Sequence, residues 1–132
     1  MNTVKFESNY RVRINKLQRH IEQLATHIPD QKSFLFDQSI IERLSSRDLI
    51  PESIPHHYHD LYVKENLHLC RNMKGVLYEL NDRFIAAYRD KLITEGEYLK
   101  GTELVTDVLK VLNHQIQSLE KKPLNKVRLI QN

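Results

Sequence analysis

Residues 10–28 read YRVRINKLQRHIEQLATHI, and residues 105–119 read VTDVLKVLNHQIQSL. In both stretches apolar residues recur at alternating spacings of three and four. This spacing places them along one narrow line of a helix, the line that packs against another helix in coiled coils and bundles. We call the two lines the first and the second seam. They consist of Tyr10, Ile14, Leu17, Ile21, Leu24 and Ile28, and of Val105, Leu109, Leu112, Ile116 and Leu119.

The seams predict the first and the last helix of the chain. The first is expected from about Ser8 to Ile28, because a residue that precedes a proline, as Ile28 does, is disfavoured in a helix. The last is expected to start near Glu95 or Thr102 and to end by Lys122, before the next proline.

Two further helices are expected between the seams. A loop over residues 29–32 leads to a short helix that starts at Ser33 or Asp37, since both side chains are good helix caps. A long central helix is expected over residues 56–94, where apolar residues form a wider face than in the seams. Only Gly75 interrupts its pattern, so the helix either continues there or bends.

We therefore predict one domain over residues 1–132, an all-α antiparallel bundle of three or four helices with one long central helix. Residues 123–132 form a basic tail that either docks or stays flexible. The chain has only three glycines and four prolines, which disfavours hairpin-rich sheets and glycine-rich phosphate loops. The wider central helix favours a compact bundle over one rod-like coiled coil. The seams either close this bundle or exchange partners in a dimer.

No segment for targeting or membrane insertion is evident. The first residues, MNTVKFESNY, lack the apolar run of a signal peptide, and no stretch approaches the length of an apolar membrane span. Cys70 is the only cysteine, so the chain cannot form an internal disulfide. We therefore expect a cytoplasmic protein that does not bind a membrane.

Positive charge is concentrated at both ends of the chain. Residues 1–28 carry five Lys or Arg against two Glu, residues 121–132 carry four Lys or Arg and no acid, and the interval between them is net acidic. These side chains either contact phosphates on one shared face or hold the ends against the acidic body. The candidate nucleic-acid residues are Arg11, Arg13, Lys16, Arg19, Lys121, Lys122, Lys126 and Arg128.

Four of the seven histidines lie close together, between positions 56 and 68. Because imidazole and carboxylate are zinc ligands, His56, His59 and Asp60 are the candidates for a metal site. On one continuous helix only His56 and Asp60 share a face within reach, and two ligands do not close a site. The alternative is a polar helix start whose stability varies with pH. Further ligands would have to come from other helices, where the remaining histidines are His20, His27 and His114. We expect no metal and no cofactor.

The sequence contains no recognisable catalytic motif. The patterns G-x-S-x-G, G-x-G-x-x-G, the P-loop and C-x-x-C do not occur. Cys70 lies between Leu69 and Arg71 in a helical stretch, where a small packed side chain is favoured over a nucleophile with a neighbouring histidine as its base. We therefore expect a protein that is not an enzyme.

Two kinds of binding protein remain. The favoured one is a small helical interaction protein, an adaptor, chaperone-like or regulatory subunit, that contacts a protein partner and forms a homodimer. Its contact residues are expected at seam positions 10, 14, 17, 21 and 24, and at 105, 109, 112 and 116. The alternative is a nucleic-acid-associated helical protein that uses its basic first helix and its C-terminal tail.

Overall fold

A computed structural model describes residues 3–45 and 59–121 of the protein. Its elements are helices α1 (Thr3–Ala25), α2 (Gln38–Ser45), α3 (His59–Arg89) and α4 (Glu95–Glu120), with the 3-10 helix η1 (Asp30–Phe36) before α2. The residues in these two ranges form no strand. The prediction of an all-α bundle with one long helix is confirmed. The predicted tail over 123–132 lies outside the described residues.

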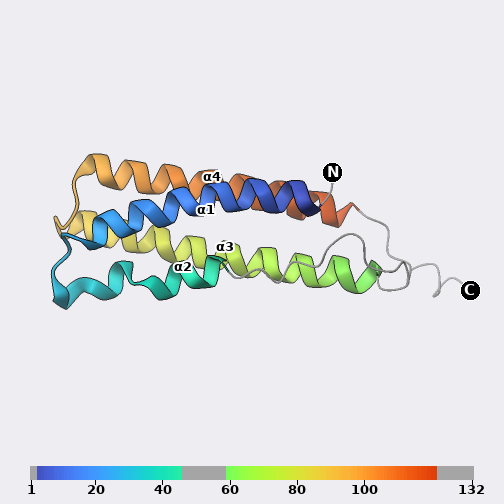
Figure 1. Ribbon diagram of the computed structural model, residues 1–132, viewed down its shortest axis with the longest axis horizontal. Coiled ribbons are helices and arrows are strands. Elements are labelled where there is room, and N and C mark those ends of the chain that lie inside the picture. Colours follow the sequence, from blue (N-terminus) through green and yellow to red (C-terminus); the bar gives the residue numbers. More distant parts are fainter. Residues whose placement is uncertain (1–2, 46–58, 122–132) are drawn as a thin grey trace, which may run out of the picture.

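Successive helices run in alternating directions along one long axis, with η1 and α2 together forming one of the legs (Figure 1). α3 makes its most extensive contact with α4, and α4 also packs along α1. η1 and α2 lie against α1 and α3, so they fill the fourth corner of the bundle. α1 begins and α4 ends at one end, which we call the terminal end; α3 connects to α4 at the other, which we call the turn end.

Both seams face the interior of this bundle. Every residue of the first seam is buried, and so is every residue of the second except Leu109, which is half-buried against the core. Burial of one such aliphatic side chain contributes about 1.5–3 kcal/mol relative to leaving it in water. In the single chain the seams therefore close the bundle, which is one of the two roles that their spacing predicts.

The first helix differs from its prediction at both ends. α1 begins at Thr3, five residues before the expected start, and no proline or glycine precedes Ser8 to stop it. It ends at Ala25, because the Thr26 and His27 amides donate to carbonyl oxygens only three residues back, at 3.3 and 3.2 Å. The first seam nonetheless continues beyond the helix, since its last residue stays buried.

The loop expected over residues 29–32 is wrong, because this stretch opens η1. The Lys32 amide donates to the carbonyl oxygen of Pro29 at 2.8 Å, and the tight turns that follow carry Leu35 and Phe36 into the core. α2 then begins directly after Asp37, one of the two predicted starts.

α3 continues without a break through Gly75 and ends at Arg89, five residues before the predicted end. The amides of Leu92 and Lys91 donate to carbonyl oxygens five and three residues back, at 2.9 and 3.0 Å. This is the Schellman arrangement that ends many helices. Lys91 takes the left-handed position with φ 62°, where glycine or asparagine is usual. The start of the long helix near residue 56 lies outside the described residues.

A capping box starts α4 at Glu95, the earlier of its two predicted starts. The Glu97 amide donates to the Thr94 hydroxyl oxygen at 3.1 Å, and the Thr94 amide donates to the Glu97 carboxylate at 2.8 Å. Two otherwise unbonded amides are satisfied in this way. Glu97 is thereby fixed in the first turn of α4, facing α1.

Phe84 of α3 is the point where four elements meet at the turn end. The centroid of its ring lies 5.3 Å from that of Phe36 in η1 and 5.9 Å from that of His20 in α1. On α4, a Cβ atom added at Gly101 would lie 2.8 Å from the Phe84 ring. α4 can approach α3 this closely only because Gly101 has no side chain. This contact also holds His20 beside α4.

Arg83 ties η1 to α3. Its guanidinium donates to the carbonyl oxygens of Phe34 and Leu35 at 2.7 and 3.3 Å, near the end of η1 where such oxygens lack helical partners. It also pairs with Glu79 at 2.6 Å, and Glu79 pairs with Arg43 of α2 at 3.1 Å. The hydrogen bond from Arg43, with Arg83 adding to it, holds the pKa of Glu79 below its ordinary value.

Candidate functional site: a basic groove between α1 and α4

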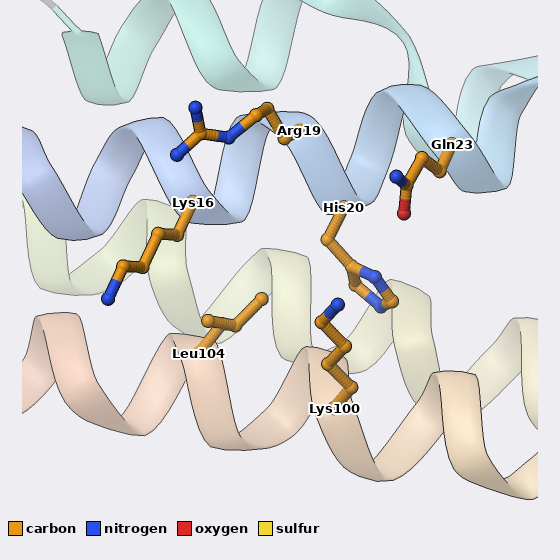
Figure 2. Close-up of a pocket in the computed structure, with 6 residues that line it drawn as sticks. All are labelled: Lys16, Arg19, His20, Gln23, Lys100 and Leu104. Atoms are coloured by element: carbon orange, nitrogen blue, oxygen red, sulfur yellow. The ribbon is translucent and has the colours of Figure 1, made fainter.

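A groove lies between α1 and α4 (Figure 2), and the α4 residues that line it belong to the first half of that helix, toward the turn end. It comprises two hollows of about 230 and 340 Å³, which share His20, Gln23 and Lys100. The first hollow is completed by Lys16, Arg19 and Leu104, and the second by Leu24, Thr94, Gly96 and Glu97. We call the two hollows together the α1–α4 groove.

His20 links the two walls of this groove. Its Nε2 atom lies 2.9 Å from the carbonyl oxygen of Glu97. Because a carbonyl oxygen only accepts, Nε2 carries the proton and Nδ1 of the neutral ring is an acceptor. Burial lowers the pKa of His20 below the usual 6.5, and the positive charge of Lys100 lowers it further, against the raising effect of the bond to Glu97. The ring is therefore neutral at neutral pH.

Glu97 contacts two histidines that lie seven residues apart, His20 in α1 and His27 in the turn that follows α1. His20 bonds its carbonyl oxygen, and Nε2 of His27 lies 3.3 Å from its carboxylate. The hydrogen bond from the Thr94 amide, with His27 adding to it, lowers the pKa of the Glu97 carboxyl. The carboxylate at the edge of the second hollow is therefore ionised and already bonded.

The first hollow, in contrast, gathers positive charge. Lys16, Arg19 and Lys100 line it, and no carboxylate does. Figure 2 shows Lys16 and Lys100 extending from opposite helices into the space between them, with Arg19 lying along α1. Within the described part of the chain, no ion pair includes any of these three side chains. Like charges that share a hollow repel, so an anion bound there is favoured.

Among the predicted nucleic-acid residues that the structure describes, Lys16 and Arg19 line the groove. Arg11 and Arg13 are half-buried on α1 and do not line either hollow. Sequence reasoning missed Lys100, which lies in neither basic end of the chain. No local pattern indicates it, because it meets Lys16 only through the packing of α4 on α1.

The C-terminal candidates are separate from the groove. Lys121 is exposed just after α4, about 30 Å along the helix from Lys100 at 1.5 Å per residue. α1 begins and α4 ends at the same end of the bundle, so the predicted convergence of the two ends concerns the terminal end (Figure 1). The remaining candidates, Lys122, Lys126 and Arg128, lie outside the described residues.

The structure gives no support to the predicted metal candidates. His56 lies outside the described residues, His59 is described only as the first residue of α3, and Asp60 is half-buried in the first turn of that helix. Over residues 3–45 and 59–121, no group of three or more His, Cys, Asp or Glu side chains could hold a metal ion. His20 and His27 instead contact Glu97.

Cys70 is buried in the core, as the sequence predicts. Burial raises the pKa of its thiol to about 12, so the thiol stays protonated at neutral pH. Because the thiolate is the nucleophile, this cysteine is unreactive where it lies.

A second surface lies on the outer side of α3. Tyr78 and Ile85 are 53% and 41% exposed, and Tyr88 is 39% exposed and stacks on Tyr98 of α4 at a centroid distance of 4.8 Å. Exposed residues along this side recur at spacings of three and four, as buried ones do in the seams. We call the surface formed by Gly75, Tyr78, Asp82, Ile85 and Tyr88 the α3 outer face.

Comparison of the chain with protein-family models, with curated proteins and with solved structures gave no match. Among the helices in the described ranges, none combines the length and the apolar content needed to cross a membrane. The assignment of a function therefore rests on the α1–α4 groove and the α3 outer face.

Proposed function

We propose that this protein is a small non-enzymatic interaction protein, an adaptor, chaperone-like or regulatory subunit, that acts through helix-face contacts and forms a homodimer. The α3 outer face supports this proposal, because it exposes large apolar side chains at the spacing that packs one helix against another. The seams are buried within the single chain, so a dimer formed through them requires helices to exchange between copies.

The α3 outer face suits an antiparallel pairing with the same face of a second copy. In a symmetric pair, each surface contacts its own equivalent. When Tyr78 of one copy lies opposite Ile85 of the other, Gly75 lies opposite Tyr88. No heavy atom lies within 4 Å of the position that a Cβ atom would take at Gly75. Gly75 therefore leaves room for the opposing tyrosine ring.

Light scattering of the full chain over a series of concentrations tests this proposal. We expect a dimer, and we expect Tyr78→Ser combined with Ile85→Ser to convert it to a monomer with an unchanged melting temperature. The matched control, Val12→Ser with Leu99→Ser, removes similarly exposed apolar side chains from α1 and α4 and leaves the dimer intact. A monomer at every concentration contradicts self-association. A dimer that survives the α3 substitutions uses another contact, of which helix exchange through the seams is one.

Association with nucleic acid is a second candidate function, and the first hollow of the groove supports it. Lys16 and Arg19, both predicted phosphate contacts, line this hollow together with Lys100. The affinity that comes from contacts between such cations and phosphates falls steeply as the salt concentration rises. Titration of labelled oligonucleotides at increasing salt tests this function, and no detectable binding at low salt removes it.

A further inference from the structure

We infer that the first hollow of the α1–α4 groove binds a backbone phosphate of a single-stranded nucleic acid between Lys16 and Lys100, with Arg19 beside them. This inference rests on the second candidate function, association with nucleic acid. A phosphate accepts charge-assisted hydrogen bonds from lysine and arginine, which are stronger than bonds between neutral groups. It would also remove the repulsion among three cations that share the hollow without a carboxylate.

The charge distribution assigns the phosphate to the first hollow and not to the second. The second hollow includes the ionised carboxylate of Glu97, which would repel a phosphate. Gln23 and Lys100 line both hollows, so the strand can leave the phosphate site along the groove past a neutral amide donor. The half-buried side chain of Leu104 gives the first hollow an apolar surface for a sugar or a base.

The shape of the groove favours a single strand over a duplex. A helix that reads duplex DNA projects into a major groove about 12 Å wide. Here the three exposed cations line a hollow of about 230 Å³ between two packed helices, and neither α1 nor α4 projects from the bundle to enter a major groove. Proteins that bind single strands use positively charged grooves that follow the backbone.

Packing fixes the two helices from which the exposed lysines extend before any ligand binds. Lys100 precedes Gly101, whose close approach to Phe84 fixes α4 against α3. Lys16 lies one turn before His20, which bonds α1 to the first turn of α4. A site whose walls are already held loses less entropy on binding than a site formed by loops.

Fluorescence anisotropy with a labelled single-stranded oligothymidylate, and with a duplex of equal length, tests this inference on the full chain. We expect Lys16→Ala with Lys100→Ala to weaken binding of the single strand about tenfold or more. The slope of log affinity against log salt should fall by about 0.7 for each phosphate contact removed. The matched control, Lys32→Ala with Lys110→Ala, removes two exposed lysines outside the groove and should leave both quantities unchanged.

The other outcomes separate this inference from the function on which it rests. Equal binding by the groove variant and the control variant overturns the inference and leaves nucleic-acid association to another surface. Tighter binding of the duplex overturns the choice of a single strand. If neither oligonucleotide binds at low salt, both ideas fail, even where inorganic phosphate shifts the NMR signals of Lys16 and Lys100 and so marks a site for a free phosphate. An unchanged melting temperature shows that the groove variant is folded.

Discussion

The turn end and the terminal end of the bundle both bury apolar side chains, but they differ in how their polar groups are bonded. At the turn end, His20 of α1 bonds the Glu97 carbonyl oxygen of α4, and Arg83 of α3 bonds the carbonyl oxygens of Phe34 and Leu35 in η1. Toward the terminal end, Arg71 of α3 and Glu120 of α4 pair at the exposed surface, whereas the interior holds Asn66 and Gln115, whose buried side-chain oxygens have no hydrogen-bond partner among the described residues. Nearby, a small separate cluster packs Tyr62, Val63 and Leu119.

This difference indicates where the relative positions of the helices are set. A hydrogen bond between elements fixes them to one arrangement, because each donor needs an acceptor at a defined distance. Apolar contacts tolerate exchange of one side chain for another of similar volume. We therefore expect substitutions at the turn end to be more damaging than matched substitutions at the terminal end.

Truncation of one fully buried apolar side chain at each end should show the greatest contrast. Phe84→Ala removes a ring that contacts three other elements, and we expect a loss of about 3–5 kcal/mol in the free energy of unfolding. Leu119→Ala opens a cavity in the small terminal cluster, and we expect about 2 kcal/mol. Urea unfolding followed by circular dichroism measures both. Equal losses would contradict the difference between the two ends.

Alanine substitution at two glycines should change stability in opposite directions. Gly101→Ala puts a methyl group 2.8 Å from the Phe84 ring, and overpacking of this kind costs about 1–3 kcal/mol. Gly75→Ala meets open space in the single chain, and at concentrations where the protein is monomeric it should raise stability by about 0.5–1 kcal/mol, because alanine loses less backbone entropy on folding. Thermal unfolding of the two variants checks both signs. A stabilised Gly101→Ala protein would show that α3 and α4 can separate without cost.

Replacement of a polar side chain should also reduce stability more at the turn end than at the terminal end. Arg83→Met removes the donor to the Phe34 and Leu35 carbonyl oxygens, with an expected loss of about 1–2 kcal/mol. Asn66→Leu has a similar shape; it removes a buried oxygen that has no partner and also the Nδ2 bond to the Tyr62 carbonyl oxygen at 3.1 Å, and because these two effects oppose each other we expect little net change. Urea midpoints measured side by side decide this. A large loss in Asn66→Leu would mean that its amide oxygen is bonded in solution.

The smallest expected effect is a change of stability with pH that comes from His20. Its folded pKa is lowered, so the unfolded chain takes up the proton first as the pH falls below 6.5. Stability is therefore full above 6.5 and declines below it until the folded ring is also protonated, by at most about 1.4 kcal/mol per pH unit for one proton. The groups around His20 are Lys100 and Glu97 of α4, the uncharged Phe84 of α3, and the neighbouring cations of α1.

Urea unfolding at pH values on both sides of 6.5, and above the range where carboxylates titrate, measures this dependence. His20→Gln should flatten it, and the control His114→Gln, at an exposed position on α4, should not. The same slope in the His20→Gln variant would contradict a neutral buried His20.

Much of the fold could be predicted because the seams are a local property of the sequence. Spacing alone determines which side of a helix is apolar, and Tyr10 to Leu24 are buried as that spacing predicts. The end of α3 could not be predicted, because Lys91 takes a left-handed position where the usual sequence marker is glycine. The start of η1 could not be predicted either, because a short 3-10 helix has too few turns to show an apolar periodicity.

The candidate site could be predicted only in part. Lys16 and Arg19 are evident as basic residues off a seam, but Lys100 joins them through the register of α4 against α1, which no single-helix pattern contains. Arg83 was also missed, although its spacing of four from Glu79 is that of a helical ion pair. Its bonds to η1 depend on tertiary packing and leave no mark in the sequence.

Tyr10 gives the protein an optical reporter of its own. Its hydroxyl donates to the Leu44 carbonyl oxygen at 2.9 Å, joining the first half of α1 to the last turn of α2. Burial raises the pKa of this phenol, so its ionisation in alkali requires α2 to move away from α1. The chain contains no tryptophan, but five other tyrosines also give tyrosinate absorbance in alkali. The difference between alkaline absorbance titrations of the protein and of its Tyr10→Phe variant therefore follows the detachment of α2 from α1 without any added label.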